Sequence, residues 1–301
     1  MNFKKINTNI LVGFSRLISY LPIFLLVKIG AFVGFLTWLF PNKRKKIAAR
    51  NLKLCFPNLS RSQHNTLLKK NLISTGIGLF EMIMAFWSSD KKLANRVEFN
   101  GFEHLENALS QNKGCILLSC HLHSIEINTR LINLQLSNKG HMLARQHNNK
   151  IFEKHIDKAR RNHCELTIDK KDVRTVLKSL KKNHPVYYVP DQNFSYQCEF
   201  VEFFGQPAAT VIAPVRIAQI SKSPVIPWFG FREKDKTGKI IWKIHFYKPL
   251  EYFQEKEVNS CLLKMNQLFE KQILKYPEQY LWVHRRFKNH PNGKNFLYKD
   301  L

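Results

Sequence analysis

The chain has 301 residues, and its 44% of apolar residues, 12% aromatic, can bury a core large enough to offset chain entropy, which excludes a disordered protein. The 48 Lys and Arg exceed the 22 Asp and Glu by 26, which indicates an anionic partner: nucleic acid, membrane, phosphorylated substrate or acidic protein. The six cysteines form no C-x-x-C pair, which argues against a zinc ribbon, a thioredoxin motif and a disulfide framework.

A long apolar run near the amino terminus is the first distinctive segment. Residues 17–40 contain one charge, Lys28, and as a helix they would be about 36 Å long, enough to cross a hydrocarbon core. The run ends at Phe40 and Pro41 with no small-residue cleavage site, so we expect it to stay attached. Because Pro22 would kink the helix and Lys28 lies near its centre, a helix in the membrane interface remains an alternative to a spanning one, and a buried core helix is a third.

Basic residues follow this run more densely than they precede it. The sequence NKRKK at 42–46 comes directly after it, whereas Lys4 and Lys5 lie before it. By the positive-inside rule, the remainder of the chain faces the cytoplasm. We therefore predict an amino-terminal membrane anchor at 1–42 and one cytoplasmic domain at 43–301.

The pattern of apolar residues predicts the fold of that domain. Residues 43–95 have helical spacing throughout and form a helical membrane-side segment. Short apolar runs then alternate with helical ones, and the strands are expected at 97–102, 113–120, 140–145, 184–190 and 223–231. A hairpin at 234–239, a helix at 258–274 and a last strand at 281–287 follow. The alternation predicts an α/β fold with a mixed, largely parallel sheet flanked by helices.

The candidate catalytic pair lies where the second of these strands ends. His121 directly follows the run CILLSC, and HLHSIE then begins a helical pattern. The carboxyl end of a strand that leads into a helix is where catalytic groups gather in α/β sheets. Glu126, in the first helical turns, could accept a hydrogen bond from one imidazole nitrogen and leave the other as a general base for a hydroxyl.

Other interpretations of this segment remain open. A His and a Glu five residues apart are also typical of a charge pair at a helix start, and His123 could meet Glu126 on one helical face. Cys120 is expected in the core, and Ser124 has no G-x-S-x-G elbow around it. The spacing lacks the H-E-x-x-H pattern, so no metal site is expected at this motif.

Longer motifs carry a family resemblance. The run SCHLHSIEINTRL resembles the H-x-x-x-x-[DE] acyltransferase signature, which alone is unspecific. The rest of the chain resembles the late acyltransferases of lipid A biosynthesis, the lauroyl and myristoyl transferases. The motifs that carry this resemblance, in chain order, are ARNLKLCFPNLS (49–60), GCILLSCHLHSIE (114–126), VYYVPDQNF (186–194), FFGQPAAT (203–210) and PEQYLWVHRRFK (277–288).

The resemblance implies an inner-membrane enzyme with a glycerolipid-acyltransferase-like domain. It would transfer a fatty acyl chain from acyl carrier protein to a hydroxyl on a hydroxyacyl chain of a Kdo-bearing lipid A precursor, without a metal or another cofactor. In this family His121 would be the general base and Glu126 its acidic partner. Arg145 matches a family arginine, and Asp191 matches the aspartate of the PD-[HQ]-D stretch.

Two positions depart from the family pattern. Lys170 stands where an arginine is common, and lysine loses the bidentate fork that grips carboxylate or phosphate. Asn193 replaces a second aspartate, so that position is not an obligatory proton carrier here. Arg145, Lys170, Arg285 and Arg286 are the candidate cations for phosphates or Kdo carboxylates, with Asp191 also assigned to substrate binding.

The sequence leaves open a different acceptor for the acyl group and a non-catalytic binding function. A glycerophospholipid or mannoside acyltransferase of the same broad fold would share His121 and Glu126. A non-catalytic binder of nucleic acid or anionic lipid would suit the charge, but the sequence contains no recognised nucleic-acid module. Phe203, Phe204 and residues 77–87 could line an acyl-chain pocket or simply pack in the core.

Overall fold

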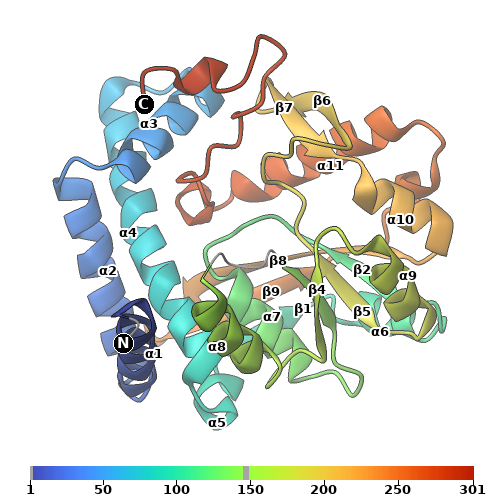
Figure 1. Ribbon diagram of the computed structural model, residues 1–301, viewed down its shortest axis with the longest axis horizontal. Coiled ribbons are helices and arrows are strands. Elements are labelled where there is room, and N and C mark those ends of the chain that lie inside the picture. Colours follow the sequence, from blue (N-terminus) through green and yellow to red (C-terminus); the bar gives the residue numbers. More distant parts are fainter. Residues whose placement is uncertain (1–2, 145–148) are drawn as a thin grey trace.

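The computed structural model describes residues 3–144 and 149–301, which form a seven-stranded sheet, a separate two-stranded hairpin and the helices around them (Figure 1). The strands are β1 (Val97–Asn100), β2 (Cys115–Leu118), β3 (His141–Ala144), β4 (Leu166–Asp169), β5 (Pro185–Tyr188), β6 (Cys198–Phe203), β7 (Gln206–Val211), β8 (Val225–Lys234) and β9 (Ile240–Phe246). The α-helices are α1 (Phe3–Ile18), α2 (Ile23–Leu39), α3 (Lys43–Cys55), α4 (Arg61–Trp87), α5 (Asp90–Ala94), α6 (Glu103–Leu109), α7 (Ile125–Asn133), α8 (Lys150–Arg160), α9 (Val173–Lys181), α10 (Ala213–Ser221) and α11 (Val258–Ile273). The described residues also form three short 3-10 helices, η1 (Glu251–Gln254), η2 (Pro277–Gln279) and η3 (Phe296–Tyr298).

The seven-stranded sheet is mixed, as the sequence predicted. Its strand order is β1-β9-β8-β2-β5-β3-β4, and every neighbouring pair is parallel except the β8–β9 hairpin. Strand β4 and the antiparallel pair β6–β7 were not predicted. The expected last strand at 281–287 is wrong, because this segment forms turns closed by local backbone hydrogen bonds, such as Trp282 N–H to the Tyr280 carbonyl.

Alternate residues of the central strands pack into two separate hydrophobic cores, one on each face of the sheet. Ile116 and Leu118 of β2 join the core that includes α9, α10 and α11, whereas Cys115 and Leu117 join the core that includes α6, α7 and α8. Helix α4 contributes Leu72 to the first core and other residues to the second, so it runs past both faces at one end of the sheet. The near-continuous apolar sequence of β2 reflects burial on both sides.

The amino-terminal apolar run is broken where the sequence places a proline. Helix α1 ends at Ile18 and α2 begins at Ile23 after Pro22, so the prediction of one helix over 17–40 is wrong and the predicted kink is confirmed. Within the described part of the chain, no single helix combines the length and apolar character needed to cross a membrane. The bent pair α2 and α3, at 83°, meets those criteria by length and composition only.

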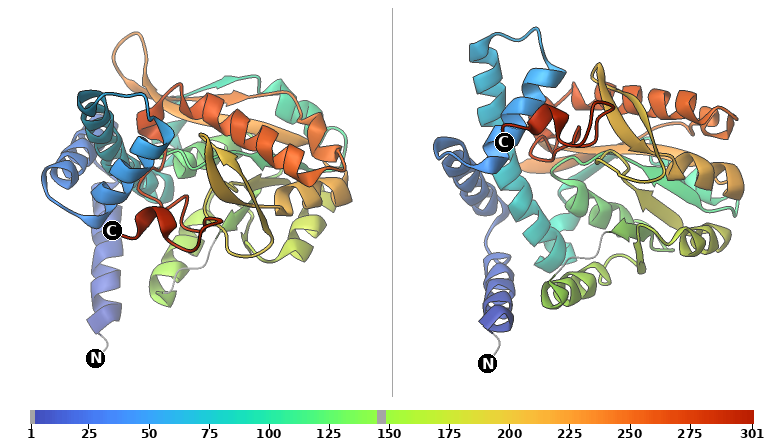
Figure 2. Two further views of the ribbon diagram at one scale, coloured as in Figure 1. Left: turned by 90° about the horizontal axis from the view of Figure 1, so that it is seen from above. Right: turned by 45° about the horizontal axis from the view of Figure 1, so that its top comes forward.

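Helix α2 lies along α4 with its backbone almost in contact. A Cβ added at Gly34 would lie 2.3 Å from the Leu72 carbonyl oxygen and 2.6 Å from the Ile73 Cα, and one at Gly76 would lie 2.3 Å from the Gly30 carbonyl oxygen. Only glycine permits this approach. Figure 2 shows α2 against α4 while α1 protrudes from the rest of the molecule.

Candidate functional site

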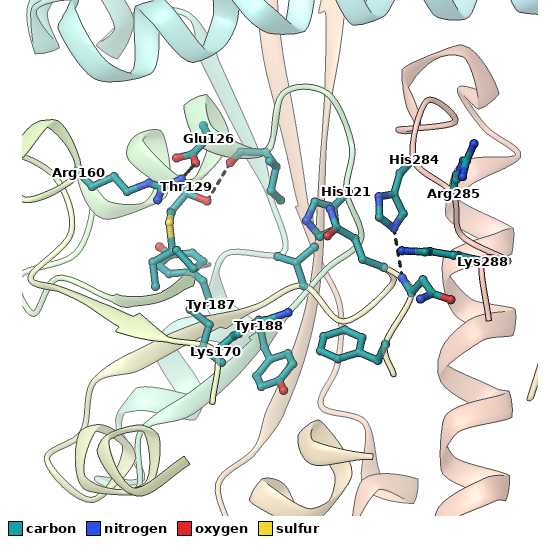
Figure 3. Close-up of a pocket in the computed structure, with 18 of the residues that line it drawn as sticks. His121, Glu126, Thr129, Arg160, Lys170, Tyr187, Tyr188, His284, Arg285 and Lys288 are labelled. Atoms are coloured by element: carbon teal, nitrogen blue, oxygen red, sulfur yellow. Dashed lines mark hydrogen bonds and ion pairs between the residues drawn. The ribbon is translucent and has the colours of Figure 1, made fainter. Parts of the chain in front are cut away.

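A cavity of about 710 Å³ opens at the carboxyl ends of the parallel strands (Figure 3). Strands β2, β3, β4 and β5 all point their carboxyl ends at it, which is the location expected for ligands in an α/β sheet. The residues that line it are Lys43, Arg44, Ile47, His121, Ile125, Glu126, Thr129, Met142, Leu143, Ala144, Arg160, Lys170, Tyr187, Tyr188, Val189, Gln192, Asn193, Phe194, His284, Arg285 and Lys288.

His121 lies in this cavity and is held by Asp191, not by Glu126. The Nδ1 of His121 lies 2.5 Å from Oδ1 of Asp191, and the His121 backbone N–H donates to Oδ2 at 2.9 Å. The sheet register explains this contact. Strands β2 and β5 pair Leu118 with Tyr188, and His121 and Asp191 each follow three residues later, so the two loops leave the sheet side by side.

Asp191 is ionised although it is buried. Burial alone raises the pKa of a carboxyl, but the His121 ring, its two hydrogen bonds and the hydroxyl of Tyr280 lower the pKa of Asp191 to about 2. The carboxylate therefore accepts a hydrogen bond from the Nδ1–H group of His121 and fixes that tautomer. Only 1% of the Asp191 side chain is exposed, against 25% of the His121 side chain.

The second nitrogen of His121 is available for chemistry. Among the described residues, Nε2 has no hydrogen-bond partner, and the ring borders the cavity. His284 lies across from it, and burial together with the nearby His121 lowers the pKa of His284 to about 4, so His284 is neutral at pH 7. The Asn193 backbone N–H donates to Nε2 of His284 at 3.3 Å, which confirms that this nitrogen carries the lone pair.

Glu126 occupies a different wall of the cavity. Its Oε1 pairs with the Arg160 guanidinium, and Figure 3 shows these two on one side of His121 with His284 and Lys288 on the other. The predicted hydrogen bond between His121 and Glu126 is therefore wrong, because the register of β2 and β5 places Asp191, and not Glu126, beside Nδ1 of His121. Burial lowers the pKa of Arg160, but Glu126 outweighs it, and the pKa is raised.

The competing pair of His123 and Glu126 does not form either. His123 points away from the cavity, with Nδ1 2.9 Å from the Ser74 hydroxyl and Nε2 3.1 Å from the Thr75 hydroxyl. Burial and the charge of Arg232 lower the pKa of His123 to about 3. It is a neutral group of the interior packed on α4.

Basic side chains dominate the rim of the cavity. Six line it, against one acidic side chain, Glu126. Lys170 is among them as predicted, with its ammonium 4.8 Å from the centre of the Phe194 ring. Within the described residues, the ammonium groups of Lys43 and Lys288 have no ion-pair partner, so their charge is available to a ligand.

The neighbouring arginines near the carboxyl terminus have opposite environments. Arg285 lines the cavity and donates to the Leu301 carbonyl at 2.8 Å. Arg286 is only 2% exposed, does not line the cavity, and donates to the Ala209 carbonyl and the Thr210 hydroxyl, both at 2.7 Å. The prediction that Arg286 binds substrate is not supported, because the side chain is buried away from the cavity and both terminal nitrogens donate to groups inside the protein.

The remaining predictions have mixed outcomes. Arg145 lies outside the described residues. Phe203 is fully buried against other aromatic rings, and neither it nor Phe204 lines the cavity. Sequence reasoning missed His284, Arg160 and the basic pair Lys43 and Arg44 at the start of α3. The runs HRRFK and NKRKK contain His284 and this basic pair, so they were the available signal for them.

Comparison with known proteins gives the chain a family context. Residues 3–289 match the profile of the family described as bacterial lipid A biosynthesis acyltransferase. The lipid A biosynthesis lauroyltransferase of Escherichia coli (strain K12) is 31% identical over 286 residues, which cover 94% of this chain and 91% of that protein. The lipid A biosynthesis palmitoleoyltransferase of the same strain is 30% identical over 282 residues, covering 92% and 90%.

A solved structure aligns over a similar span. The 1-acyl-sn-glycerophosphate (LPA) acyltransferase PlsC from Thermotoga maritima aligns with a TM-score of 0.40 and 13% identity, covering 91% of this chain and 99% of that one. This likeness is too low to support an inference.

Proposed function

Because the chain belongs to the bacterial lipid A biosynthesis acyltransferase family, and is thus an acyltransferase, we propose that it moves a fatty acyl chain from acyl carrier protein to a hydroxyl on a hydroxyacyl chain of a Kdo-bearing lipid A precursor. One observation carries the mechanism: a buried carboxylate holds His121 Nδ1 while Nε2 faces a cavity lined with cations. That geometry suits removal of a proton from a neutral alcohol.

The reaction begins at Nε2 of His121. The acceptor hydroxyl donates its hydrogen to Nε2, its oxygen forms a bond to the thioester carbonyl carbon, and Nε2 takes the proton. Asp191, ionised at pH 7, stabilises the imidazolium that results. When the tetrahedral intermediate collapses, the carbon–sulfur bond breaks and the carrier thiolate receives the proton from Nε2, so the ring returns to its starting state.

The cations around the cavity would bind the anionic parts of the acceptor. The cations that line the cavity include Lys43, Lys170, Arg285 and Lys288. Figure 3 shows Arg285 and Lys288 beside His284, and Lys170 apart from them near Tyr188. Phosphates and Kdo carboxylates are strong partners for such groups. The developing oxyanion of the intermediate would gain from the same positive field.

Glu126 has a supporting part in this proposal. It pairs with Arg160, both side chains are mostly buried, and both line the cavity. We assign the pair to the shape and charge of the cavity wall, and the orientation of the base to Asp191.

We further propose attachment to the cytoplasmic face of the bacterial inner membrane through α1 and α2. Large apolar side chains stay exposed on these helices and in the residues next to them: Ile10, Leu11, Phe14, Leu17, Tyr20, Phe24, Phe32, Leu39 and Phe40. Exposed apolar surface of this extent, next to the basic start of α3, fits an anionic lipid surface. A tag at the amino terminus, tested for protease access in sealed vesicles, separates a spanning anchor from an interfacial one.

The test of the reaction uses the full-length protein in detergent with a Kdo-bearing lipid A precursor. With acyl-acyl carrier protein as donor, the precursor should gain the mass of one acyl group less the hydrogen it replaces, and fragmentation should place the new ester on a hydroxyacyl chain. A precursor left unchanged while lysophosphatidic acid or a mannoside is acylated would reject the proposed acceptor.

A further inference from the structure

Three neighbouring strands each begin beside a side chain that can bind a metal ion. His141 is the first residue of β3, Glu165 immediately precedes β4, and His184 immediately precedes β5. The register pairs His141 with Leu166 and with Val186, so the three side chains lie at the same edge of the sheet. This is the amino-terminal edge, about 10 Å along the four-residue strand β3 from the edge that carries the cavity.

The donor atoms are already close together. One donor atom from each of His141, Glu165 and His184 can be chosen so that all three lie within 4.8 Å of one another. In a tetrahedral site with bonds of about 2.1 Å the donors would be about 3.4 Å apart. The Glu165 side chain is 53% exposed, so it can rotate to close the difference.

The hydrogen bonds around His141 leave a buried lone pair. The Ser179 hydroxyl donates to the Thr175 carbonyl at 2.8 Å, so its oxygen must accept at the 2.7 Å contact with His141 Nδ1. The proton of the neutral ring is therefore on Nδ1, and the lone pair is on Nε2. His141 is only 6% exposed, and within the described part of the chain Nε2 has no partner.

His184 completes the arrangement from the next strand. Its ring stacks on His141 with centroids 4.1 Å apart, and its Nδ1 lies 3.6 Å from Oε2 of Glu165 and 3.2 Å from the Lys139 carbonyl oxygen. The Lys139 carbonyl can only accept, so Nδ1 carries the ring proton in that hydrogen bond. A neutral imidazole can carry its proton on either nitrogen, so metal binding through Nδ1 would move the proton to Nε2 and replace the hydrogen bond to Lys139. The pKa of His141 is lowered to about 4, mainly by burial and also by the nearby His184 and Lys182, although Glu165 acts in the opposite direction. The ring is therefore neutral at pH 7.

We propose that His141, Glu165 and His184 bind one divalent transition-metal ion, for which zinc fits best. Two imidazoles and one carboxylate are a ligand set that zinc accepts, with water in the fourth position, whereas calcium and magnesium prefer oxygen ligands. The Ser179 hydroxyl orients His141 as outer partners do in zinc sites. The bound ion would tie together the starts of β3, β4 and β5, away from His121. It is separate from the catalytic motif, where no metal is expected.

The test measures zinc binding directly, without reference to acyl transfer. Full-length protein in detergent, stripped with EDTA, is titrated with zinc chloride at pH 7.5 by calorimetry. One saturable equivalent is expected, and it should also raise the thermal midpoint. Replacement of the outer partner, Ser179→Ala, should weaken binding by roughly 10–100-fold. Glu165→Gln, at an exposed position where folding is not at risk, should weaken binding by at least about tenfold.

Glu106→Gln is the matched control, because Glu106 is an exposed glutamate on α6 that is not one of the three proposed ligands. It should bind zinc as the unsubstituted protein does. The proposal is overturned if the stripped protein shows no saturable site, or if Glu165→Gln and Ser179→Ala bind zinc as tightly as Glu106→Gln.

Discussion

Asp191 binds His121 at two points, the ring Nδ1 at 2.5 Å and the backbone N–H at 2.9 Å. The two contacts use both oxygens of one buried carboxylate, so the side chain and the backbone of His121 are fixed by the same group. Because the carboxylate stays ionised, the ring keeps its proton on Nδ1 and its lone pair on Nε2. The proposed chemistry of the cavity depends on this arrangement, in which Glu126 takes no part.

The neighbouring arginines give a matched pair of substitutions. Arg286→Met removes two buried donors from the Ala209 carbonyl and the Thr210 hydroxyl, so we expect a loss of roughly 2–4 kcal/mol in unfolding free energy. Arg285→Met should change stability far less and raise the KM for the anionic acceptor, because Arg285 lines the cavity. Thermal unfolding and steady-state kinetics check both. A larger KM effect from Arg286→Met at unchanged stability would contradict these assignments.

The Glu126–Arg160 pair predicts a rescue. Glu126→Gln leaves a mostly buried guanidinium unpaired, and we expect a loss of about 3–5 kcal/mol in unfolding free energy. Adding Arg160→Met removes the stranded charge, so the double variant should regain most of that stability. Denaturant unfolding of the two single variants and the double variant measures the coupling. Equal stability of Glu126→Gln and the double variant would show that the two side chains do not act together.

Buried and partly buried histidines make the fold sensitive to acid. Burial lowers the pKa of His123 to about 3 and of His141, His163 and His284 to about 4. The folded pKa of each is below the unfolded value near 6.5, so the stabilisation is complete above pH 6.5 and is lost as pH falls toward 4.

Each of these histidines takes up one proton on unfolding, which contributes a slope of about 1.4 kcal/mol per pH unit between pH 6 and 4.5. Urea unfolding at pH 7.5, 6.0 and 5.0 should show this decline. The replacement His163→Gln should reduce the slope by one histidine's share. A free energy of unfolding that stays constant over this range would contradict the neutral, buried state of the rings.

The close packing of α2 on α4 predicts a size limit at Gly34. A methyl group there would lie within 2.3–2.8 Å of α4 backbone atoms, so Gly34→Ala should lower the free energy of unfolding by roughly 1–3 kcal/mol. Gly13→Ala on α1 is the control, because a Cβ there meets nothing within 4 Å. Thermal unfolding in detergent distinguishes them. Equal midpoints for the two variants would show that α2 and α4 are not in this contact.

Local sequence patterns predicted much of this molecule. The alternation of strands and helices, the hairpin at 234–239 and the position of His121 just beyond a strand all follow from apolar spacing and turn residues. The segment at 281–287 shows the limit of such patterns. Its apolar alternation is typical of a strand, yet its backbone forms turns, and these turns bury Trp282 and Phe287.

The partner of His121 required information that spacing along the chain does not hold. Glu126 is five residues away in sequence and Asp191 is seventy, but β2 and β5 are neighbours in register, and this places the distant acid on the ring. The ends of the two strands contain the signal for this contact. In CILLSCH and VYYVPD, His121 and Asp191 each come three residues after the paired residues Leu118 and Tyr188. Likewise, Arg285 and Arg286 differ only through tertiary contacts.

The role of Asp191 is measured by acyl transfer in Asp191→Asn, compared with His121→Ala and with the Glu126→Gln/Arg160→Met double variant. Asparagine keeps the size of Asp191 but removes the charge that fixes the tautomer and stabilises the imidazolium, so kcat should fall by about 10²–10⁴-fold at pH 7.5. His121→Ala should lose as much or more, and the double variant should lose far less. Near-normal kcat in folded Asp191→Asn, with a loss in the double variant that matches His121→Ala, would contradict the account.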